Sequence, residues 1–159
     1  MIIAITGSVG TGKTTIAKAL ARKLKADYID VNKLIKENKL VGKYIKKLDT
    51  YEVDVKKLNR FLIKIIKNCK NCVIDSHLSH YLPNKYVGYC VVCKCGIKDL
   101  KNRLEKRGYS KIKIRENLDS EIFDVCLVEA VENNHRIIVV DTTNKSVNNC
   151  VNEILNKLA

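Results

Sequence analysis

The sequence has little that would divide it into parts or carry it through a membrane. It contains one proline, Pro83, seven glycines and no tryptophan among 159 residues. Repeats, low-complexity segments and Gly/Ser linkers are absent, and no apolar run approaches the roughly 20 residues that a membrane-spanning helix needs. The start of the chain does not resemble a signal peptide. We therefore expect one domain over residues 1–159, in the cytoplasm, with no membrane contact.

Acidic residues are also scarce. There are 17 Asp and Glu against 30 Lys and Arg, which gives a formal net charge of +13. Such a charge favours polyanionic partners such as nucleotides, RNA or an acidic protein surface. Only six of the basic residues are arginines. Because arginine binds phosphate through two parallel hydrogen bonds whereas lysine is a flexible point charge, the few arginines are the more informative candidates.

Seven cysteines raise the question of disulfides or a metal site. A nucleotide motif and the lack of a secretion signal argue for a reducing compartment, so we expect free thiols. Cys69 and Cys72 form a CxxC, and Cys90, Cys93 and Cys95 follow, so a four-ligand zinc site is an alternative. The last three lie in an apolar, strand-like segment where cysteine acts as a small buried hydrophobe. We favour ordinary packing.

Short apolar runs alternate with helical patterns along the chain. We expect buried strands at Ile2–Thr6, Asp27–Asp30, Cys72–Asp75, Tyr89–Cys93 and Arg136–Val140. We expect helices at Lys13–Leu24, Val31–Asn38, Val53–Lys67, Ile97–Arg107, about Ser110–Glu132 and Val147–Leu158. This order predicts an α/β fold, with a five-stranded parallel sheet flanked by helices.

The stretch GSVGTGKT, Gly7 to Thr14, follows the first expected strand and precedes the first expected helix. Its spacing and its context fit the phosphate-binding loop of P-loop NTPases, in which glycines bring backbone N–H groups close to a phosphate. A glycine-rich turn that only caps a helix is the alternative. We expect ATP to contact Gly10, Gly12, Lys13, Thr14 and Thr15, with Lys13 on the β- and γ-phosphates and the Thr14 hydroxyl on Mg²⁺.

A magnesium site of this kind usually has a second carboxylate at the end of a neighbouring strand. Asp75 and Asp141 both fit, and we favour Asp75 because the polar residues after it suit a ligand-binding edge. Its alternative role is to cap the following turn. His77 and His80 could bind metal if they were helical, but Pro83 indicates a loop. A histidine of this loop beside the phosphate site could orient the nucleophile or contact the γ-phosphate, and surface solvation is the default role of any single histidine.

Arg103, Arg107 and Arg115 place half of the arginines within thirteen residues. Gly108 is expected to break a helix, and Ser110 to cap the next one. Arginines on such a helix–hinge–helix element could close over ATP and neutralise charge during phosphoryl transfer. A solvated basic helix face is the alternative, and the enrichment of arginine over lysine favours the functional role.

Four segments together resemble the small archaeal and eukaryotic adenylate kinase-like proteins, whose human member is a coilin-interacting nuclear ATPase. They are TGSVGTGKTTIAKALA, YIDVNKLIKENKL, VIDSHLSHYLP and RLEKRGYSKIKIRENLDSEIF. The resemblance implies a nucleoside monophosphate kinase that uses AMP, with ATPase activity and a link to maturation of the small ribosomal subunit through a ribosomal protein. It implies that Asp75, acting through a water, and His77 match a Walker-B-like pair, and that Arg107 contacts ATP from a lid at about 106–116. It also implies a monophosphate-binding segment at about 30–53.

The chain departs from the family in that segment. No arginine lies between Arg22 and Arg60, and Lys36 stands where human relatives carry arginine. A lysine there weakens bidentate recognition of the acceptor phosphate and leaves room for an ATPase whose kinase activity is secondary.

Three functions are therefore compatible with the sequence. The leading one is phosphoryl transfer from MgATP to AMP, with Lys13, Arg107, Asp75 and His77 at the reacting groups and no covalent intermediate. The second is an ATP-switched assembly factor that binds rRNA or a small-subunit ribosomal protein. The third is a shikimate-type metabolite kinase in which Asp30 accepts a substrate proton. We expect a monomer or a weak oligomer.

Overall fold

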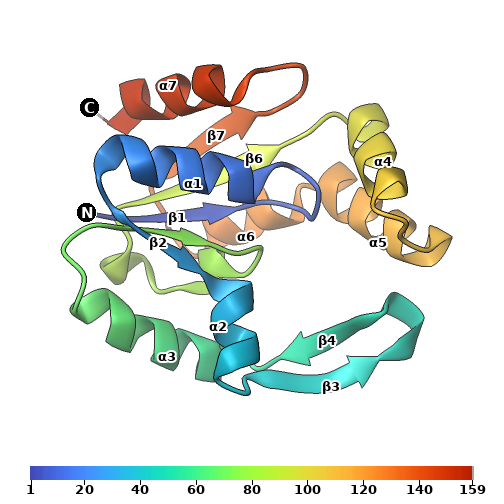
Figure 1. Cartoon of the computed structure of the whole chain (residues 1–159), viewed down its shortest axis with the longest axis horizontal. Helices are drawn as coiled ribbons and strands as arrows, with labels where there is room; N and C mark the ends of the chain where they lie inside the picture. The colour runs from blue at the N-terminus through green and yellow to red at the C-terminus, as the bar shows by residue number, and fades with distance from the viewer. Residues whose placement is uncertain (159) are drawn as a thin grey trace.

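The computed structural model describes residues 1–158, in which a single parallel sheet carries helices on both faces (Figure 1). Its five strands lie in the order β2-β5-β1-β6-β7, and every pairing within the sheet is parallel. They are β1 (Ile2–Thr6), β2 (Asp27–Asp30), β5 (Cys72–Asp75), β6 (Tyr89–Lys94) and β7 (Ile137–Asp141). The predicted five-stranded parallel sheet is confirmed.

Each face of the sheet has its own apolar core. Helices α1 (Lys13–Leu24) and α7 (Val147–Leu158) cover the face that carries Ile3 and Ile5. Helices α3 (Val55–Lys67) and α6 (Val125–Glu132) cover the opposite face, which carries Ala4. Burial on both faces explains why these strands are nearly continuous in apolar character rather than alternating. Within residues 1–158, none of the helices has the length and apolar character that crossing a membrane would need.

Side-chain caps determine where several helices begin. The Asp30 carboxylate accepts a hydrogen bond from the Lys33 N–H and starts α2 (Val31–Glu37), and Asp54 starts α3 in the same way. Ser110 caps α5 (Lys111–Ile122) as predicted, because its hydroxyl accepts from the Lys113 N–H at 3.2 Å. Such caps satisfy N–H groups that a helix cannot pair internally.

The helices α4 (Ile97–Lys106) and α5 form a unit beyond the carboxyl edge of the sheet (Figure 1). They share a small core of their own, in which Leu100 and Leu104 of α4 pack against Ile114 and Leu118 of α5. The predicted break at Gly108 is confirmed, since this glycine lies between the helices with a φ of 71°. The two helices therefore pack against each other through apolar side chains of their own.

The single long helix predicted from about Ser110 to Glu132 is wrong. The chain leaves the helical conformation after Ile122, and Asp124 has a φ of 51°, so α5 and α6 run in different directions. The Lys94 ammonium, at the end of β6, pairs with the carboxylates of Glu121 and Asp124 across this corner. These charge contacts stabilise the left-handed conformation of Asp124. The sequence has no glycine at this position that would indicate such a conformation.

A two-stranded antiparallel hairpin was also missed. It consists of β3 (Val41–Ile45) and β4 (Thr50–Val53), with a 3₁₀ turn at Lys46–Leu48 between them. Most of its side chains are exposed, including Tyr44 and Tyr51, whose ring centroids lie 5.0 Å apart. Because neither face is buried, the segment lacks the apolar alternation by which a strand is recognised.

The seven cysteines are free thiols, and all but Cys69 are buried. Burial raises the pKa of Cys90 and of Cys93 to about 12, so both stay protonated at neutral pH. Over residues 1–158 no cluster of three or more His, Cys, Asp or Glu side chains is arranged to hold a metal ion.

Candidate functional site

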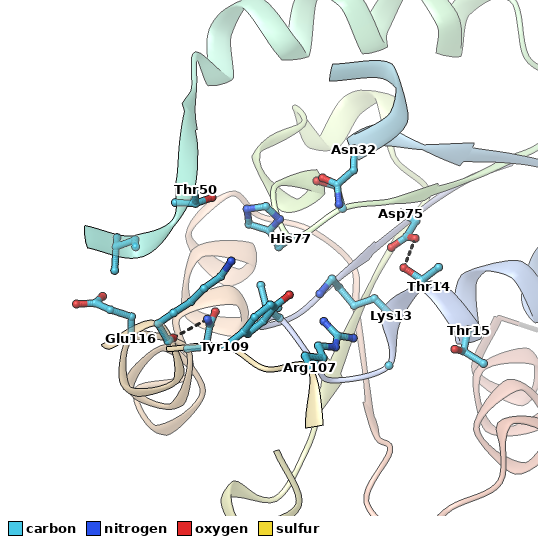
Figure 2. Close-up of a pocket in the computed structure, with 17 residues that line it drawn as sticks. Lys13, Thr14, Thr15, Asn32, Thr50, Asp75, His77, Arg107, Tyr109 and Glu116 are labelled. Carbon is cyan, nitrogen blue, oxygen red and sulfur yellow. Dashed lines mark hydrogen bonds between the residues drawn. The ribbon is translucent and has the colours of Figure 1, made fainter. Parts of the chain in front are cut away.

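A pocket of about 470 Å³ opens at the carboxyl ends of the strands, where the phosphate-binding loop, the loop after β5, α2, the hairpin and the α4–α5 unit meet (Figure 2). In open parallel sheets this edge is where ligands bind. The site residues predicted from the sequence line it, namely Gly10, Gly12, Lys13, Thr14, Thr15, Asp75, His77 and Arg107. The sequence motif and the pocket therefore coincide.

Glycines determine the path of the phosphate-binding loop, Gly7–Thr14. Gly10 and Gly12 have φ values of 89° and 92°, which L side chains rarely adopt. Gly12 is also the N-cap of α1, so the loop ends at the positive end of a helix dipole. The loop thus has the backbone conformation and the helix terminus that a phosphate site requires.

The Lys13 side chain crosses the loop and reaches into the pocket (Figure 2). Its ammonium donates to the Ser8 carbonyl at 3.0 Å. Burial lowers its pKa below the ordinary lysine value, while the Asp75 carboxylate acts in the opposite direction. A cation in this environment gains more from an incoming phosphate than an exposed lysine would.

Thr14 and Asp75 form a pair of oxygen ligands. The Thr14 hydroxyl donates to Asp75 Oδ2 at 2.7 Å, and the Tyr28 hydroxyl donates to the same oxygen at 2.8 Å. A hydroxyl beside a buried carboxylate suits Mg²⁺, which prefers oxygen donors. Tyr28 was not predicted, since only the pairing of β2 with β5 brings it beside Asp75.

The competing carboxylate, Asp141, has a different task. Its side chain is exposed and accepts from the Thr143 N–H at 2.8 Å. Hydrogen bonds from the Thr143 side chain and, secondarily, from this N–H lower the pKa of Asp141. It therefore caps the turn after β7 and does not line the pocket. Of the two strand-end aspartates, the structure brings only Asp75 to Thr14.

The three arginines that cluster in the sequence have different environments in the structure. Arg107 lines the pocket together with Lys13 (Figure 2). Arg103 instead donates to the Gly10 carbonyl at 3.3 Å and to the Thr142 hydroxyl at 3.2 Å, so it ties the phosphate-binding loop to the loop after β7. Arg115 is exposed and pairs with Asp119 on its own helix at 3.1 Å. The expectation of closure over ATP therefore fits Arg107 and does not fit Arg115.

The two histidines of DSHLSH have different environments. His77 lines the pocket (Figure 2). His80 is buried, with Nδ1 2.7 Å from the Thr6 hydroxyl and Nε2 2.7 Å from Glu129 Oε2. His80 therefore links the end of β1 to α6, and it lies outside the residues that line the pocket. Surface solvation, the default role for both, is wrong for His80.

We expect His77 to remain neutral throughout the neutral pH range. Although His77 is exposed in the open pocket, the surrounding protein, and secondarily the Lys13 ammonium, lower its pKa from 6.5 to about 4. Its ring signals in a proton NMR titration should therefore move near pH 4. The unfolded chain protonates near pH 6.5, so this histidine weakens the fold as pH falls from about 6.5 to 4. The His77→Gln spectrum identifies the signal, and a midpoint near 6.5 would contradict the prediction.

Several pocket residues were not singled out from the sequence. Asn32 comes from α2, Leu48 and Thr50 from the hairpin, and Tyr109, Lys113, Glu116 and Asn117 from the start of α5 and the residues before it. Lys36, expected to meet the acceptor phosphate, is exposed on α2 and does not line the pocket. Asp30 also lies outside it and serves as the cap of α2. The packing of three distant segments creates this half of the pocket, and no local motif predicts it.

A second hollow of about 390 Å³ adjoins the phosphate-binding loop on its other side. It shares Gly10, Gly12, Thr15 and Arg107 with the main pocket. Its other lining residues combine apolar side chains with polar and basic ones, and they are Ile16, Val147, Cys150, Arg103, Lys106, Thr142 and Lys145. Apolar side chains beside a phosphate site suit a flat aromatic base.

The chain is similar to a set of archaeal proteins along nearly its whole length. A family described as an AAA domain matches residues 3–124. A protein of Methanocaldococcus jannaschii named “Putative adenylate kinase” is 41% identical over 155 residues, covering 98% of this chain and 84% of that protein. A protein of Pyrococcus furiosus with the same name is 46% identical over 156 residues, covering 98% and 83%.

Solved structures share the fold at low sequence identity. Deoxyadenosine kinase from M. mycoides with bound dATP has a TM-score of 0.65 and 19% identity, with 99% of both chains covered. Shikimate kinase from Acinetobacter baumannii in complex with shikimate has a TM-score of 0.70 and 15% identity, with 99% of this chain and 92% of that chain covered. These likenesses concern the architecture of the sheet and its helices.

Proposed function

The chain belongs to the same family as the archaeal proteins named “Putative adenylate kinase”, and from this membership we propose that it transfers the γ-phosphate of ATP to AMP, giving two ADP. As a P-loop kinase it would bind a nucleotide phosphate at the loop. One observation supports the proposal that AMP is the acceptor. Lys13 and Arg107 line the same pocket as Asn32 and Thr50. Donor-side cations and acceptor-side residues thus meet in one space.

On the donor side, ATP would lie along the phosphate-binding loop. The loop N–H groups, the α1 terminus and Lys13 would bind its phosphates, with Thr15 near the α-phosphate. The adjoining hollow beside Ile16 and Val147 would receive the adenine, since it shares Gly12 and Thr15 with the main pocket. Arg107 lines both hollows and would contact ATP between them.

Thr14 and Asp75 would hold Mg²⁺, with Asp75 acting through a water. Their oxygens already lie 2.7 Å apart, and the Tyr28 hydroxyl holds the carboxylate in place. When bound, Mg²⁺ supplies charge neutralisation on the β- and γ-phosphate oxygens. The hydrogen bond from Tyr28 orients Asp75 whether the ion is present or absent.

Catalysis would then consist of positioning and electrostatic stabilisation. Lys13 and Arg107 neutralise charge that spreads over the transferring phosphoryl group, so no covalent intermediate is required. A neutral His77 can hydrogen-bond the acceptor oxygen or a water without adding charge. When the acceptor is absent, water in the same place accounts for a slower ATPase activity.

We propose that residues of about 106–116 act as the lid and those of about 30–53 as the monophosphate-binding segment. The Gly108 break between α4 and α5, with open space around its Cα, supports a hinge. The hairpin tip supplies Leu48 and Thr50 to the pocket, which supports an acceptor site on that side. Closure of the two segments would exclude water from the reaction.

A second role is favoured by the net charge of +13 and by the hairpin. Exposed Tyr44 and Tyr51 lie beside exposed Lys43, Lys46 and Lys47, a combination that suits stacking and phosphate contacts with single-stranded RNA. We propose on this ground a cytoplasmic assembly factor that binds rRNA or a small-subunit ribosomal protein, as the resemblance to the coilin-interacting ATPase also implies. The two roles are compatible in one protein.

An acceptor screen tests the proposed kinase. ADP formation from MgATP is measured without acceptor and with AMP, CMP, UMP, GMP or shikimate. We expect AMP to raise turnover far above the rate with water alone. Equal, slow rates with every acceptor would overturn the kinase and favour the assembly factor, whereas stimulation by shikimate alone would assign a metabolite kinase. RNA binding that weakens with salt and changes with nucleotide state would support the second role.

A further inference from the structure

The tip of the hairpin touches the α5 helix across the pocket. The Lys113 ammonium donates to the Asp49 carbonyl at 3.2 Å. The tip is held in shape locally, because the Tyr44 hydroxyl donates to Asp49 Oδ1 at 2.7 Å and Asp49 has a φ of 45°. Lys113 therefore spans the gap between the two segments that border the acceptor half of the pocket.

The acceptor half needs a cation, since a nucleoside monophosphate carries about two negative charges on its phosphate. The basic side chains that line the pocket are Lys13, Arg107 and Lys113. The first two border the phosphate-binding loop, and the proposed ATP contacts account for them. Lys36 and the hairpin lysines Lys43, Lys46 and Lys47 are exposed and do not line the pocket. Lys113 is the remaining basic side chain of this lining.

The contacts that Lys113 now makes are ones that a phosphate can replace. Besides the Asp49 carbonyl, its ammonium lies 4.2 Å from the centroid of the Tyr109 ring, and neither partner carries a formal charge. A phosphate adds the attraction between opposite charges to the hydrogen bond, and a neutral carbonyl does not supply that attraction. The flexible stem of a lysine also lets the ammonium move between partners, which a guanidinium fork does less readily.

The next residues along α5 fit the rest of the same ligand. Glu116 and Asn117 line the pocket one turn beyond Lys113. A carboxylate repels phosphate but accepts hydrogen bonds from sugar hydroxyls or an exocyclic amino group. This polarity places the phosphate at the Lys113 end of the helix and the nucleoside toward Glu116.

We infer that the Lys113 ammonium binds the phosphate of the nucleoside monophosphate acceptor and exchanges the Asp49 carbonyl for phosphate oxygens when the acceptor enters. The inference rests on the proposed kinase function. It assigns to a lysine of α5 the task that an arginine of the monophosphate-binding segment was expected to perform.

Binding of AMP and adenosine to the intact protein tests this inference. Calorimetry is performed with a non-hydrolysable ATP analogue and Mg²⁺ at saturation, on wild type, Lys113→Gln, Lys113→Arg and Lys36→Gln. We expect Lys113→Gln to weaken AMP binding about 10- to 100-fold, in line with the loss of a charged hydrogen bond, and to leave adenosine binding within about twofold. Lys113→Arg should restore most of the loss, Lys36→Gln should bind AMP as wild type does, and KM for AMP should follow the affinities.

Three results would overturn the inference. They are wild-type AMP affinity in Lys113→Gln, an equal loss of AMP and adenosine binding, or a loss in Lys36→Gln instead. Thermal melting of each variant shows whether a loss reflects unfolding, and Lys113→Arg keeps the test valid if Lys113→Gln is unstable. If wild type itself neither binds AMP nor phosphorylates it, the proposed kinase function fails along with the inference. That outcome differs visibly from a failure confined to Lys113.

Discussion

Lys13→Ala is expected to lower kcat by about 10²- to 10³-fold, because charge that develops on the transferring phosphoryl group loses a preorganised cation. The fold should survive this change. Burial already disfavours the charged form of Lys13, and the Ser8 carbonyl keeps a hydrogen bond from the Thr11 hydroxyl at 2.8 Å. Removing the side chain therefore leaves no unpaired acceptor at Ser8, and the Asp75 carboxylate keeps its hydrogen bonds from Thr14 and Tyr28.

The measurement is initial-rate ADP formation with saturating MgATP and AMP, together with thermal melting of each variant. Lys23→Ala is the matched control, since Lys23 lies on the same helix and is exposed away from the loop. The control should keep wild-type rates. If Lys13→Ala turned over at more than a tenth of the wild-type rate, Lys13 would have no part in stabilising the transferring group.

Gly7→Ala is expected to destabilise the protein by about 3 kcal/mol, which in a domain of this size corresponds to a fall in Tm of roughly 6–12 °C. A Cβ at this position would lie 2.4 Å from the Cys93 carbonyl oxygen and 2.9 Å from the Thr11 hydroxyl. Cys93 belongs to the neighbouring buried strand β6, so its backbone cannot yield without disturbing the sheet. The φ of 144° adds strain for any L side chain.

Comparison with Gly108→Ala distinguishes the cost of a left-handed backbone from the cost of a steric clash. Gly108 also has a positive φ, 71°, but a Cβ there would meet nothing within 4 Å. Only the cost of a left-handed residue remains, about 1 kcal/mol. Urea unfolding of the two variants compares the costs directly. Equal destabilisation would mean that the close approach of β1 to β6 contributes nothing.

The central architecture could be predicted because its signals are local and strong. Runs such as Ile2–Thr6 and Cys72–Asp75 are apolar up to their last residue, as is typical of buried parallel strands, and a glycine-rich loop joins the first run to an amphipathic helix. The same locality explains the phosphate half of the site. Its residues follow one another along a few turns of backbone, and Asp75 ends a recognisable strand.

The remainder depends on contacts between distant segments. The hairpin at Val41–Val53 buries neither face, and the corner at Asp124 is held by Lys94, 30 residues earlier in the chain. Tyr28 and Lys113 join the site through strand pairing and through contact with the hairpin tip, respectively. Lys113 lies within the lid range expected from the sequence, but only the packed structure distinguishes it from the lysines around it.

The central place of β1 also affects how the protein can be made. On the ribosome the phosphate-binding loop is synthesised before both strands that pair with β1, which begin at Cys72 and Tyr89. The groups that brace the loop come later still, since Arg103 donates to Gly10 and the Thr142 hydroxyl donates to the Thr11 carbonyl at 2.7 Å. Parallel strands pair only after such intervening chain has emerged. A nascent chain that ends before Thr142 therefore lacks one of the groups that brace the loop, and we expect ATP to stabilise the chain only after Thr142 has been added.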